Sequence, residues 1–483
     1  DEDVADDPNG AVPLESEVPQ VLGSQSVDWT PVIAFIASLE VTRKVILRSV
    51  PAFEVLRGFG AVFRKRTDPQ KLYELSRQCQ SIEEFWSHSW RSGKFWKIWL
   101  LLMLKNGLPA CLVGTLVAFM ATVLSFMHYL PGFYKEPLRN TGADIPYRFS
   151  PWAQVFGNLA ALLTLLFWRS KTEVFVDRAC IHQGDENLKN EGVLNIGAFI
   201  AQSERLVVIW DSTYATRAWC VFELAAFLKS RQDKPCRLVI KPLILAPFTF
   251  AFVIGQAGLL LCETLLPGGF LFIRFFYLIP FSILVLVLHH YWRGIWQGDE
   301  QLRDFHWRDT TCACCSRNHV DEHGSIIPCD KEALSRCIQQ WFGSVDNFNH
   351  LVHTEVRAAF RSQMTRIPFG YWWLVGIATT ILWYHLDLSI SRGNNWTFMV
   401  AYLSSSIPWL FWISPGLACL MFGLQVKCHP LIGYLMYQFI FGLVWLYWYV
   451  SWVLVSDEVW AVLAFIIGTL PVFATVLRFF AKP

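Results

Sequence analysis

The chain has 483 residues, enough for two or three domains, and its composition is not that of an ordinary soluble protein. Hydrophobic residues make up 54% of the sequence, charged residues 17%, and Phe, Trp and Tyr together 16%, which favours a multi-pass membrane protein. The formal net charge of +2 gives no reason to expect a nucleic acid as a partner. The composition therefore predicts a largely α-helical protein whose first partner is the lipid bilayer.

The first 82 residues carry two different charge patterns. Residues 1–26 are acidic, contain proline and lack the charged and apolar regions of a signal peptide, so we expect them to be disordered. In residues 27–82 apolar and basic residues alternate at helical spacing, with few acids. This pattern predicts a basic amphipathic helical region, which lies on an anionic membrane surface or is a plain surface helix.

Short apolar runs then predict the strands of a small domain with a polar site. The expected strands are residues 83–88, 171–177, 205–210 and 236–243. The third is rich in β-branched residues and is followed by a polar turn, as expected of a buried parallel strand. Helices are expected over residues 93–106 and 188–203. We expect a small parallel sheet flanked by helices, with a site at the carboxyl ends of its strands.

A membrane hairpin interrupts this domain. Residues 108–130 are apolar and long enough to span a bilayer, and residues 152–168 form a shorter apolar segment with Trp at both ends. We therefore expect residues 107–170 to be inserted between one part of the domain, residues 83–106, and its remainder, residues 171–243.

The rest of the chain is predicted to be mostly membrane. A second hairpin is expected over residues 244–291, a polar loop with two amphipathic helices over 292–367, and four further spans over 368–483. The eight expected spans are residues 108–130, 152–168, 247–266, 270–290, 368–387, 397–424, 430–454 and 458–479. Lys and Arg concentrate on one side of these spans, which places both termini and the small domain in the cytosol.

Glu223 is the one acid between Asp211 and Asp233, on a helix that is otherwise apolar and aromatic. Desolvation should raise the pKa of its carboxyl unless a partner is present, which makes it a candidate functional group. The alternative is a solvated helix acid, or an ion pair with Arg217.

The string WDSTYATRAWCVFEL around Glu223 resembles the Toll/interleukin-1-receptor (TIR) domain, in which a strand, a tyrosine-containing turn and a Trp-Cys-x-x-Glu helix follow one another. EEFWSHSWRSGKFW at 83–96 resembles the first strand and loop of the same family. The resemblance implies that Glu223 attacks or stabilises the ribose of NAD during cleavage of the nicotinamide bond. It further implies an NAD pocket that includes Ser87, Trp90, Asp177 and Trp219.

Two further resemblances concern neighbouring segments. Residues 177–183 match the Asp-x-x-Cys-Ile-x-Gln string of fungal heterokaryon-incompatibility domains, which are regarded as TIR relatives. The layout of residues 83–243 and, more weakly, 306–342 resembles multi-pass TIR-like proteins predicted in dinoflagellates and other protists. The expected fold class is therefore mixed: an α-helical membrane protein of about eight spans, with a small TIR-like α/β parallel-sheet domain on the cytosolic face, split by a membrane hairpin.

Cysteine and histidine gather in residues 306–337. Thiolate and imidazole are the ligands that zinc prefers, and adjacent cysteines rarely bind the same ion, so we expect Cys312, Cys315, His319 and Cys329 as the ligands if a metal is bound. The alternative is a reduced or lipidated cysteine cluster.

Three functions stay open on this sequence. The sequence favours a signalling or assembly module that binds other TIR-like or membrane proteins, or a subunit of a membrane complex. The alternative is a membrane-tethered NAD glycohydrolase that uses Glu223, and the third is a transporter or structural subunit in which the TIR-like part is scaffolding. A TIR-like fold alone does not decide among them.

Overall fold

The computed structural model describes residues 30–64, 67–135, 147–232, 235–265, 293–320, 328–364 and 371–390, with positions 404, 406–407 and 410–411. The chain divides into two compact units. Unit 1 comprises Asp1–Leu101, Arg169–Ile244 and Gly294–Met364, and unit 2 comprises Leu102–Trp168, Leu245–Arg293 and Thr365–Pro483. The acidic segment 1–26 lies outside the described residues.

Unit 1 is built on a six-stranded sheet of order β2-β1-β6-β3-β7-β8. Its strands are β1 (Arg48–Pro51), β2 (Arg77–Gln78), β3 (Ile82–His88), β6 (Glu173–Phe175), β7 (Ser203–Trp210) and β8 (Leu238–Pro242). The four strands from β6 to β8 are mutually parallel, whereas β1 runs antiparallel to both β6 and β2. The sheet is therefore mixed, which corrects the expectation of a purely parallel one.

Segments on either side of the insertion lie next to each other in this sheet. In the pairing of β3 with β6, Glu84 faces Val174 and Phe85 faces Phe175. The rings of Phe85 and Phe175 stack with centroids 4.7 Å apart, and Phe175 also contacts Phe199 at 5.2 Å. We expected strand 171–177 to lie next to strand 83–88 or strand 205–210 in one sheet, because neither part of the domain has enough apolar surface to fold alone. The pairing of β6 with β3 confirms this prediction.

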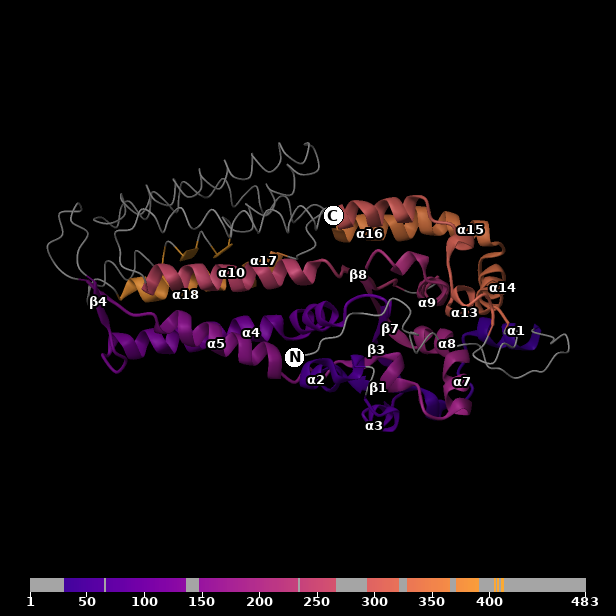
Figure 1. Cartoon of the computed structure of the whole chain (residues 1–483), viewed down its shortest axis with the longest axis horizontal. Helices are drawn as coiled ribbons and strands as arrows, with labels where there is room; N and C mark the ends of the chain where they lie inside the picture. The colour runs from indigo at the N-terminus through magenta and orange to yellow at the C-terminus, as the bar shows by residue number, and fades with distance from the viewer. Residues whose placement is uncertain are drawn as a thin grey trace. The chain divides into compact units, whose positions relative to one another are not determined.

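Unit 1 also contains helices, which lie around its sheet (Figure 1). They include α7 (Glu186–Leu194), α8 (Ile196–Ala201), α9 (Ala218–Ser230), α14 (Asp330–Phe342), α15 (Val345–Leu351) and α16 (Arg357–Met364), with a π-helical turn at Val352–Val356 between the last two. The expected helix 188–203 is divided at Asn195, which is fully buried and whose side-chain oxygen accepts a hydrogen bond from the backbone of Thr42.

The N-terminal region does not form the expected amphipathic helical stretch. It contains α1 (Thr30–Ser38), β1, α2 (Ala52–Gly60), α3 (Pro69–Glu74) and β2, with short 3-10 turns. Arg48 lies over the ring of Tyr73 at 4.2 Å, and its guanidinium donates to the Ser76 hydroxyl at 2.8 Å. Arg48, which was expected on the surface of an amphipathic helix, thus makes contacts within unit 1.

The free edge of β8 is covered by a side chain from α16. Gln363 accepts a hydrogen bond from the backbone nitrogen of Ile240 at 2.8 Å and donates one to the carbonyl of Leu238 at 2.9 Å. These bonds occupy main-chain groups through which an edge strand would otherwise pair with another chain.

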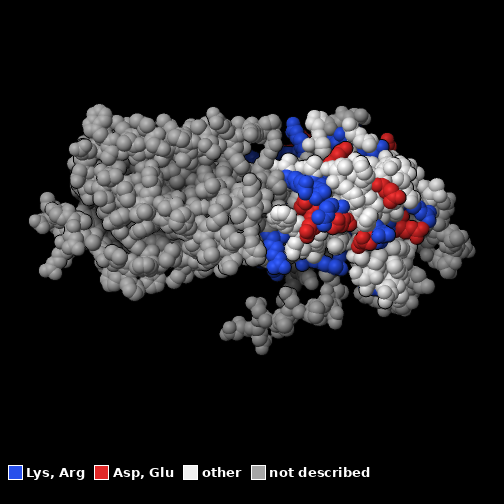
Figure 2. Space-filling model, turned by 90° about the horizontal axis from the view of Figure 1, so that it is seen from above, with Lys and Arg blue, Asp and Glu red and all other residues white. Residues whose placement is uncertain are grey.

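Charges of both signs are interspersed on the described part of the face that Figure 2 shows. Within unit 1, the Asp299 carboxylate accepts hydrogen bonds from both Arg357 and Arg361. These two guanidinium groups hold the pKa of Asp299 well below its usual range, although burial opposes the shift.

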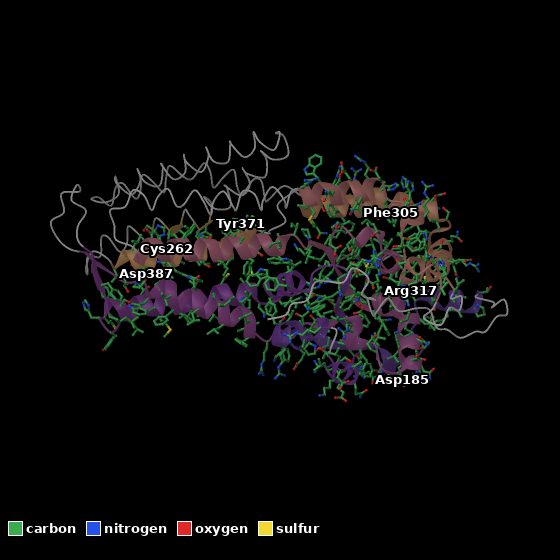
Figure 3. The ribbon with its side chains drawn as sticks, in the orientation of Figure 1. Asp185, Cys262, Phe305, Arg317, Tyr371 and Asp387 are labelled. Atoms are coloured by element: carbon green, nitrogen blue, oxygen red, sulfur yellow. The ribbon has the colours of Figure 1, made fainter. Side chains whose placement is uncertain are left out.

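Unit 2 contains the long helix α4 (Lys94–Phe126) from Leu102 onward, a two-stranded hairpin of β4 (Phe133–Lys135) and β5 (Tyr147–Phe149), and the helices α5 (Trp152–Phe167), α10 (Leu245–Leu265), α17 (Tyr371–Ile377) and α18 (Thr379–Ser389). Gly114 and Gly157 permit close packing, because a Cβ on Gly114 would lie 2.9 Å from both the Gly157 carbonyl oxygen and Trp383. Asp387, labelled in Figure 3, accepts hydrogen bonds from the backbone nitrogens of Ala153 and Gln154 at the start of α5.

Two helices of the described residues are long and apolar enough to cross a bilayer, Lys94–Phe126 and Leu245–Cys262. The prediction of about eight spans is therefore wrong. The apolar helix α5 has 16 residues, fewer than the roughly 20 that a span needs, and the expected span 368–387 contains two short helices that meet at Ala378. The other expected spans lie wholly or mainly outside the described residues: 270–290, 397–424, 430–454 and 458–479.

Candidate functional site

Polar side chains meet at the carboxyl ends of three neighbouring parallel strands. Ser87 lies near the end of β3, Asp177 follows β6 after one residue, and Tyr214 lies in the turn after β7. Glu223 reaches this edge from α9, and Trp90 from the loop after β3. We call these five residues the Glu223 site. Their position agrees with the sequence expectation, because open α/β sheets bind ligands at this edge.

A chain of short hydrogen bonds links Glu223 to the protein interior. Oε2 of Glu223 lies 2.5 Å from the Ser87 hydroxyl, which lies 2.6 Å from the Tyr214 hydroxyl. Tyr214 in turn donates to the carbonyl of Cys220 at 3.1 Å. The Ser87 hydroxyl donates to this carboxyl oxygen, so the hydrogen bond favours the charged form of Glu223.

The pKa of Glu223 is raised to about 8: burial raises it, the hydrogen bond from Ser87 lowers it, and the nearby Asp177 carboxylate raises it. Desolvation penalises the charged carboxylate, and a second negative charge adds to that penalty. Of the ion pairs among the described residues, none includes Glu223. The predicted alternative, an ion pair with Arg217, is therefore not what stabilises this group.

Asp177 is held by groups on both sides. The indole nitrogen of Trp90 donates to Oδ2 at 2.9 Å, and the backbone nitrogen of Arg178 donates to Oδ1 at 2.7 Å. Burial raises the pKa of Asp177, and these hydrogen bonds oppose that rise. The Arg178 guanidinium lies 5.9 Å from the centre of a Trp90 ring. Two carboxyl groups of different environment thus share the site, a pattern found in acid/base and glycosidic chemistry.

The site has a buried floor and a partly exposed rim. Ser87 is 1% exposed and Tyr214 is 0% exposed, whereas Trp90, Asp177 and Glu223 are half-buried. The two hydroxyl groups of the hydrogen-bond chain are therefore more completely shielded from water than the three rim residues.

Trp219 does not share the hydrogen bonds of the Glu223 site. Its indole nitrogen donates to Asp330 Oδ2 at 3.2 Å, and its ring contacts Phe222 edge to face. Of the four residues expected to line an NAD pocket, Ser87, Trp90 and Asp177 belong to the Glu223 site, whereas Trp219 lies against α14.

Two further residues at this edge were not singled out by the sequence. Tyr214 completes the hydrogen-bond chain, and its position directly after the strand and turn was the available signal. Lys97 is 2% exposed. Its ammonium donates to the Ser89 carbonyl and lies 5.7 Å from the centre of a Trp90 ring. No pattern in the sequence predicts that this lysine is buried.

A cavity of about 690 Å³ opens beside the turn that follows β7. Ser212, Ala215 and Thr216 line one side, and residues between Gln297 and Asp309 line the other, including three acids. None of its lining residues belongs to the Glu223 site. This cavity is therefore separate from the Glu223 site.

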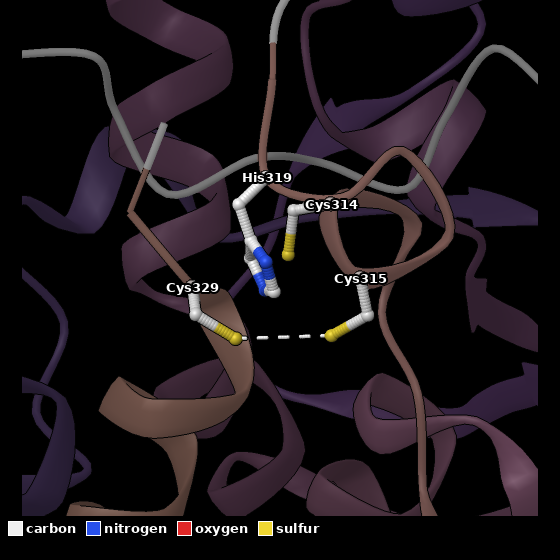
Figure 4. A group of neighbouring side chains, drawn as sticks. All are labelled: Cys314, Cys315, His319 and Cys329. Carbon is white, nitrogen blue, oxygen red and sulfur yellow. Dashed lines mark hydrogen bonds between the residues drawn. The ribbon is translucent and has the colours of Figure 1, made fainter. Parts of the chain in front are cut away.

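The Cys/His segment gathers beside α9 and α14. The ligand atoms of Cys314, Cys315, His319 and Cys329 all lie within 4.8 Å of one another (Figure 4). Cys312 belongs instead to a second group, with Cys314 and Asp330. The sequence thus found three of the four residues that converge, and the structure replaces Cys312 by Cys314.

Replacing Ser87 with Ala should raise the pKa of Glu223 above about 8, because the change removes the one hydrogen bond that favours the charged carboxylate. The folded chain binds this proton more tightly than the unfolded chain. The stabilising contribution is therefore present at low pH and is lost as pH rises from about 4.5 towards 8.

In Ser87→Ala the protonated Glu223 carboxyl should stabilise the fold up to a higher pH than in the wild type. The measurement is the ¹³C shift of the Glu223 carboxyl against pH, with exposed Glu204 as an internal control. A Glu223 titration that is unmoved, or that shifts to lower pH, would contradict the assignment.

Comparison of the chain with family models, with curated proteins and with solved structures finds no match.

Proposed function

We propose that unit 1 binds a nicotinamide dinucleotide and hydrolyses the bond between nicotinamide and ribose, with Glu223 as the catalytic carboxylate. The observation that carries this proposal is the hydrogen bond of Glu223 to Ser87 at the carboxyl ends of parallel strands, beside Asp177. The resemblance of WCVFEL and SHSW to TIR motifs implies the same chemistry and supports the choice of NAD over other N-glycosides.

The reaction needs a group that stabilises positive charge on the ribose. The bond between the anomeric carbon and nitrogen breaks with its electron pair going to nicotinamide, and the anomeric carbon gains oxocarbenium character. A carboxylate beside that carbon stabilises this charge. Water then adds to the carbon and loses a proton, so that the products are ADP-ribose, nicotinamide and H⁺.

The high pKa of Glu223 fits this role once substrate is bound. In the free protein the carboxyl is mostly protonated below pH 8, since burial favours the neutral form. The pyridinium ring of NAD carries a positive charge, and a positive charge close to a carboxyl lowers its pKa. Substrate binding therefore favours the ionised form that catalysis needs.

The main competing function is a non-enzymatic module that assembles through TIR-like surfaces. The β8 edge is a poor surface for such assembly, because Gln363 already occupies the main-chain groups of Leu238 and Ile240. An assembly module would have to use the β2 edge, its helices or its loops. We therefore favour the enzymatic function.

Release of nicotinamide from NAD by the purified full chain tests the proposal. The products are separated by chromatography, with and without antibody-induced clustering through an added terminal tag. We expect nicotinamide and ADP-ribose in equal amounts, and a kcat/KM that rises with pH through about 8 as Glu223 loses its proton. Absence of turnover under both conditions would leave the assembly module as the better explanation.

We further propose that α4 and α10 tether unit 1 to a membrane. Leu108, Leu112 and Leu116 of α4 are each more than 60% exposed and recur every four residues, so they form one apolar face. Exposed apolar surface of this kind is stable in lipid but costly in water. After alkaline carbonate extraction of cells that express the chain, it should stay in the membrane pellet. Recovery in the soluble fraction would contradict the tether.

A further inference from the structure

Four metal-binding side chains from two segments point toward one shared centre. Cys314 and Cys315 lie on the short helix α13 (Ala313–Ser316), His319 follows it, and Cys329 immediately precedes α14. Figure 4 shows the three sulfurs and the imidazole ring facing the same space. Their ligand atoms all lie within 4.8 Å of one another.

The spacing of these atoms suits coordination rather than a disulfide. The sulfurs of Cys315 and Cys329 are 3.7 Å apart. Two thiolates bound at about 2.3 Å to a tetrahedral zinc ion are separated by about 3.8 Å. The sulfurs of a disulfide are only about 2.05 Å apart. The pair therefore already has the separation of two ligands on one ion.

The backbone after α13 turns in a way that brings the histidine back over the cysteines. Asn318 and His319 both have left-handed conformations, with φ of 53° and 57°. The backbone nitrogen of His319 donates to the Cys314 carbonyl at 2.8 Å, which closes this turn. Non-glycine residues seldom adopt such φ values, and those that do commonly lie at functional sites.

His319 also has a ring nitrogen that needs a partner. Its Nε2 is buried and has no hydrogen bond from any of the residues that the structure describes. A buried imidazole nitrogen without a partner is unfavourable, and coordination of a metal ion satisfies it.

We propose that Cys314, Cys315, His319 and Cys329 bind one structural zinc ion. Three thiolates and one imidazole form a complete tetrahedral set for zinc and leave no position for a substrate. Soft thiolate ligands disfavour calcium and magnesium, which take oxygen ligands. The second group, Cys312 with Cys314 and Asp330, offers only three ligands, and Asp330 already accepts a hydrogen bond from Trp219.

The zinc site would fasten the 311–319 segment to the start of α14, next to the helix that carries Glu223. The backbone nitrogen of Thr311 donates to the Thr216 carbonyl at 2.8 Å. The Thr311 carbonyl accepts from the backbone nitrogen of Ala218 at 3.1 Å, where α9 begins. Trp341 of α14 stacks on Phe222 of α9 at 5.2 Å. This proposal does not require Glu223 to be catalytic, since the four ligands lie outside the Glu223 site.

Metal analysis of the purified full chain tests the site. The protein is prepared under reducing conditions without chelator, and zinc is measured by mass spectrometry against protein concentration. We expect about one zinc ion per chain in the wild type, less than about a fifth of that in Cys315→Ser and in His319→Ala, and about one in the exposed-cysteine control Cys236→Ser. The Cys312→Ser variant should also retain zinc, and its loss there but not in His319→Ala would assign the ion to a different ligand set.

A second measurement needs only the wild-type protein, so it remains valid even if the variants fail to fold. X-ray absorption at the zinc edge should show about three sulfurs near 2.3 Å and one nitrogen near 2.0–2.1 Å. A wild-type chain that holds no zinc, and takes up none from added zinc chloride, overturns the proposal. So does a Cys315–Cys329 disulfide, or a lipid on any of the three cysteines, found in the intact protein by mass spectrometry.

Discussion

NAD turnover should fall about a hundredfold or more when Glu223 is replaced by Gln, the scale seen when a principal electrostatic stabiliser is removed. Gln keeps the size of the side chain, and its amide oxygen can accept the hydrogen bond from Ser87 as the carboxyl oxygen does. It cannot carry the negative charge that an oxocarbenium ion requires. The readout is kcat for nicotinamide release by the purified chain at pH 8.

The fold of Glu223→Gln should be unharmed, so the loss is not a loss of structure. Above pH 8 the variant should unfold at a higher temperature than the wild type, because it no longer has to bury a charged carboxylate. Glu204→Gln is the matched control, since the Glu204 side chain is 53% exposed on β7. Undiminished turnover in Glu223→Gln, with normal turnover in the control, would exclude Glu223 as the catalytic group.

Replacing Phe175 with Ala should destabilise unit 1 by about 3–5 kcal/mol, the usual effect of truncating a fully buried Phe. Phe175 is 1% exposed, stacks on Phe85 from before the insertion and contacts Phe199 from after it. In a unit of this size, the unfolding temperature should drop by roughly 10 °C. Thermal unfolding of the purified chain, followed by circular dichroism, measures the shift.

Phe95→Ala is the control for this change. The Phe95 side chain is 40% exposed and contacts Phe59 at 5.5 Å, so its removal should cost about 1 kcal/mol or less. If the two variants unfold at the same temperature, Phe85 and Phe175 do not share one core. The segments before and after the insertion would then not fold as one unit.

Much of the sheet was predictable because its central strands are buried on both faces. The apolar run at 205–210 lies within β7, and the run at 83–88 lies within β3, with ends that differ by two residues or fewer. Strands β1 and β2 were missed because they have four and two residues. Runs that short show no periodicity, and the basic residues around them favoured a helical interpretation.

The membrane prediction failed because composition does not determine how long each helix is. Residues 94–126 form one continuous helix with Pro109 inside it, where the sequence suggested a soluble helix followed by a separate span. The apolar stretch 152–168 forms a helix too short to span. Hydropathy thus located both apolar segments, but only the first forms a helix long enough to cross a bilayer.

The candidate sites were predictable to different degrees. Glu223 was found because it is a lone acid on an apolar helix, and burial does raise its pKa. Trp219 was expected in the same pocket, but helical geometry points it to Asp330. For the metal ligands, the left-handed turn at Asn318 and His319 brings the His319 ring back to the cysteines of α13. Such a turn at non-glycine residues leaves no trace in the sequence.

The most direct test of the central claim is a structure of the full chain with a non-hydrolysable NAD analogue. The account predicts density for the nicotinamide ribose beside the Glu223 carboxyl, bordered by Ser87, Trp90 and Asp177. An analogue bound elsewhere, for example in the cavity lined by Ser212 and Thr216, or no bound analogue at saturating concentration, would contradict it.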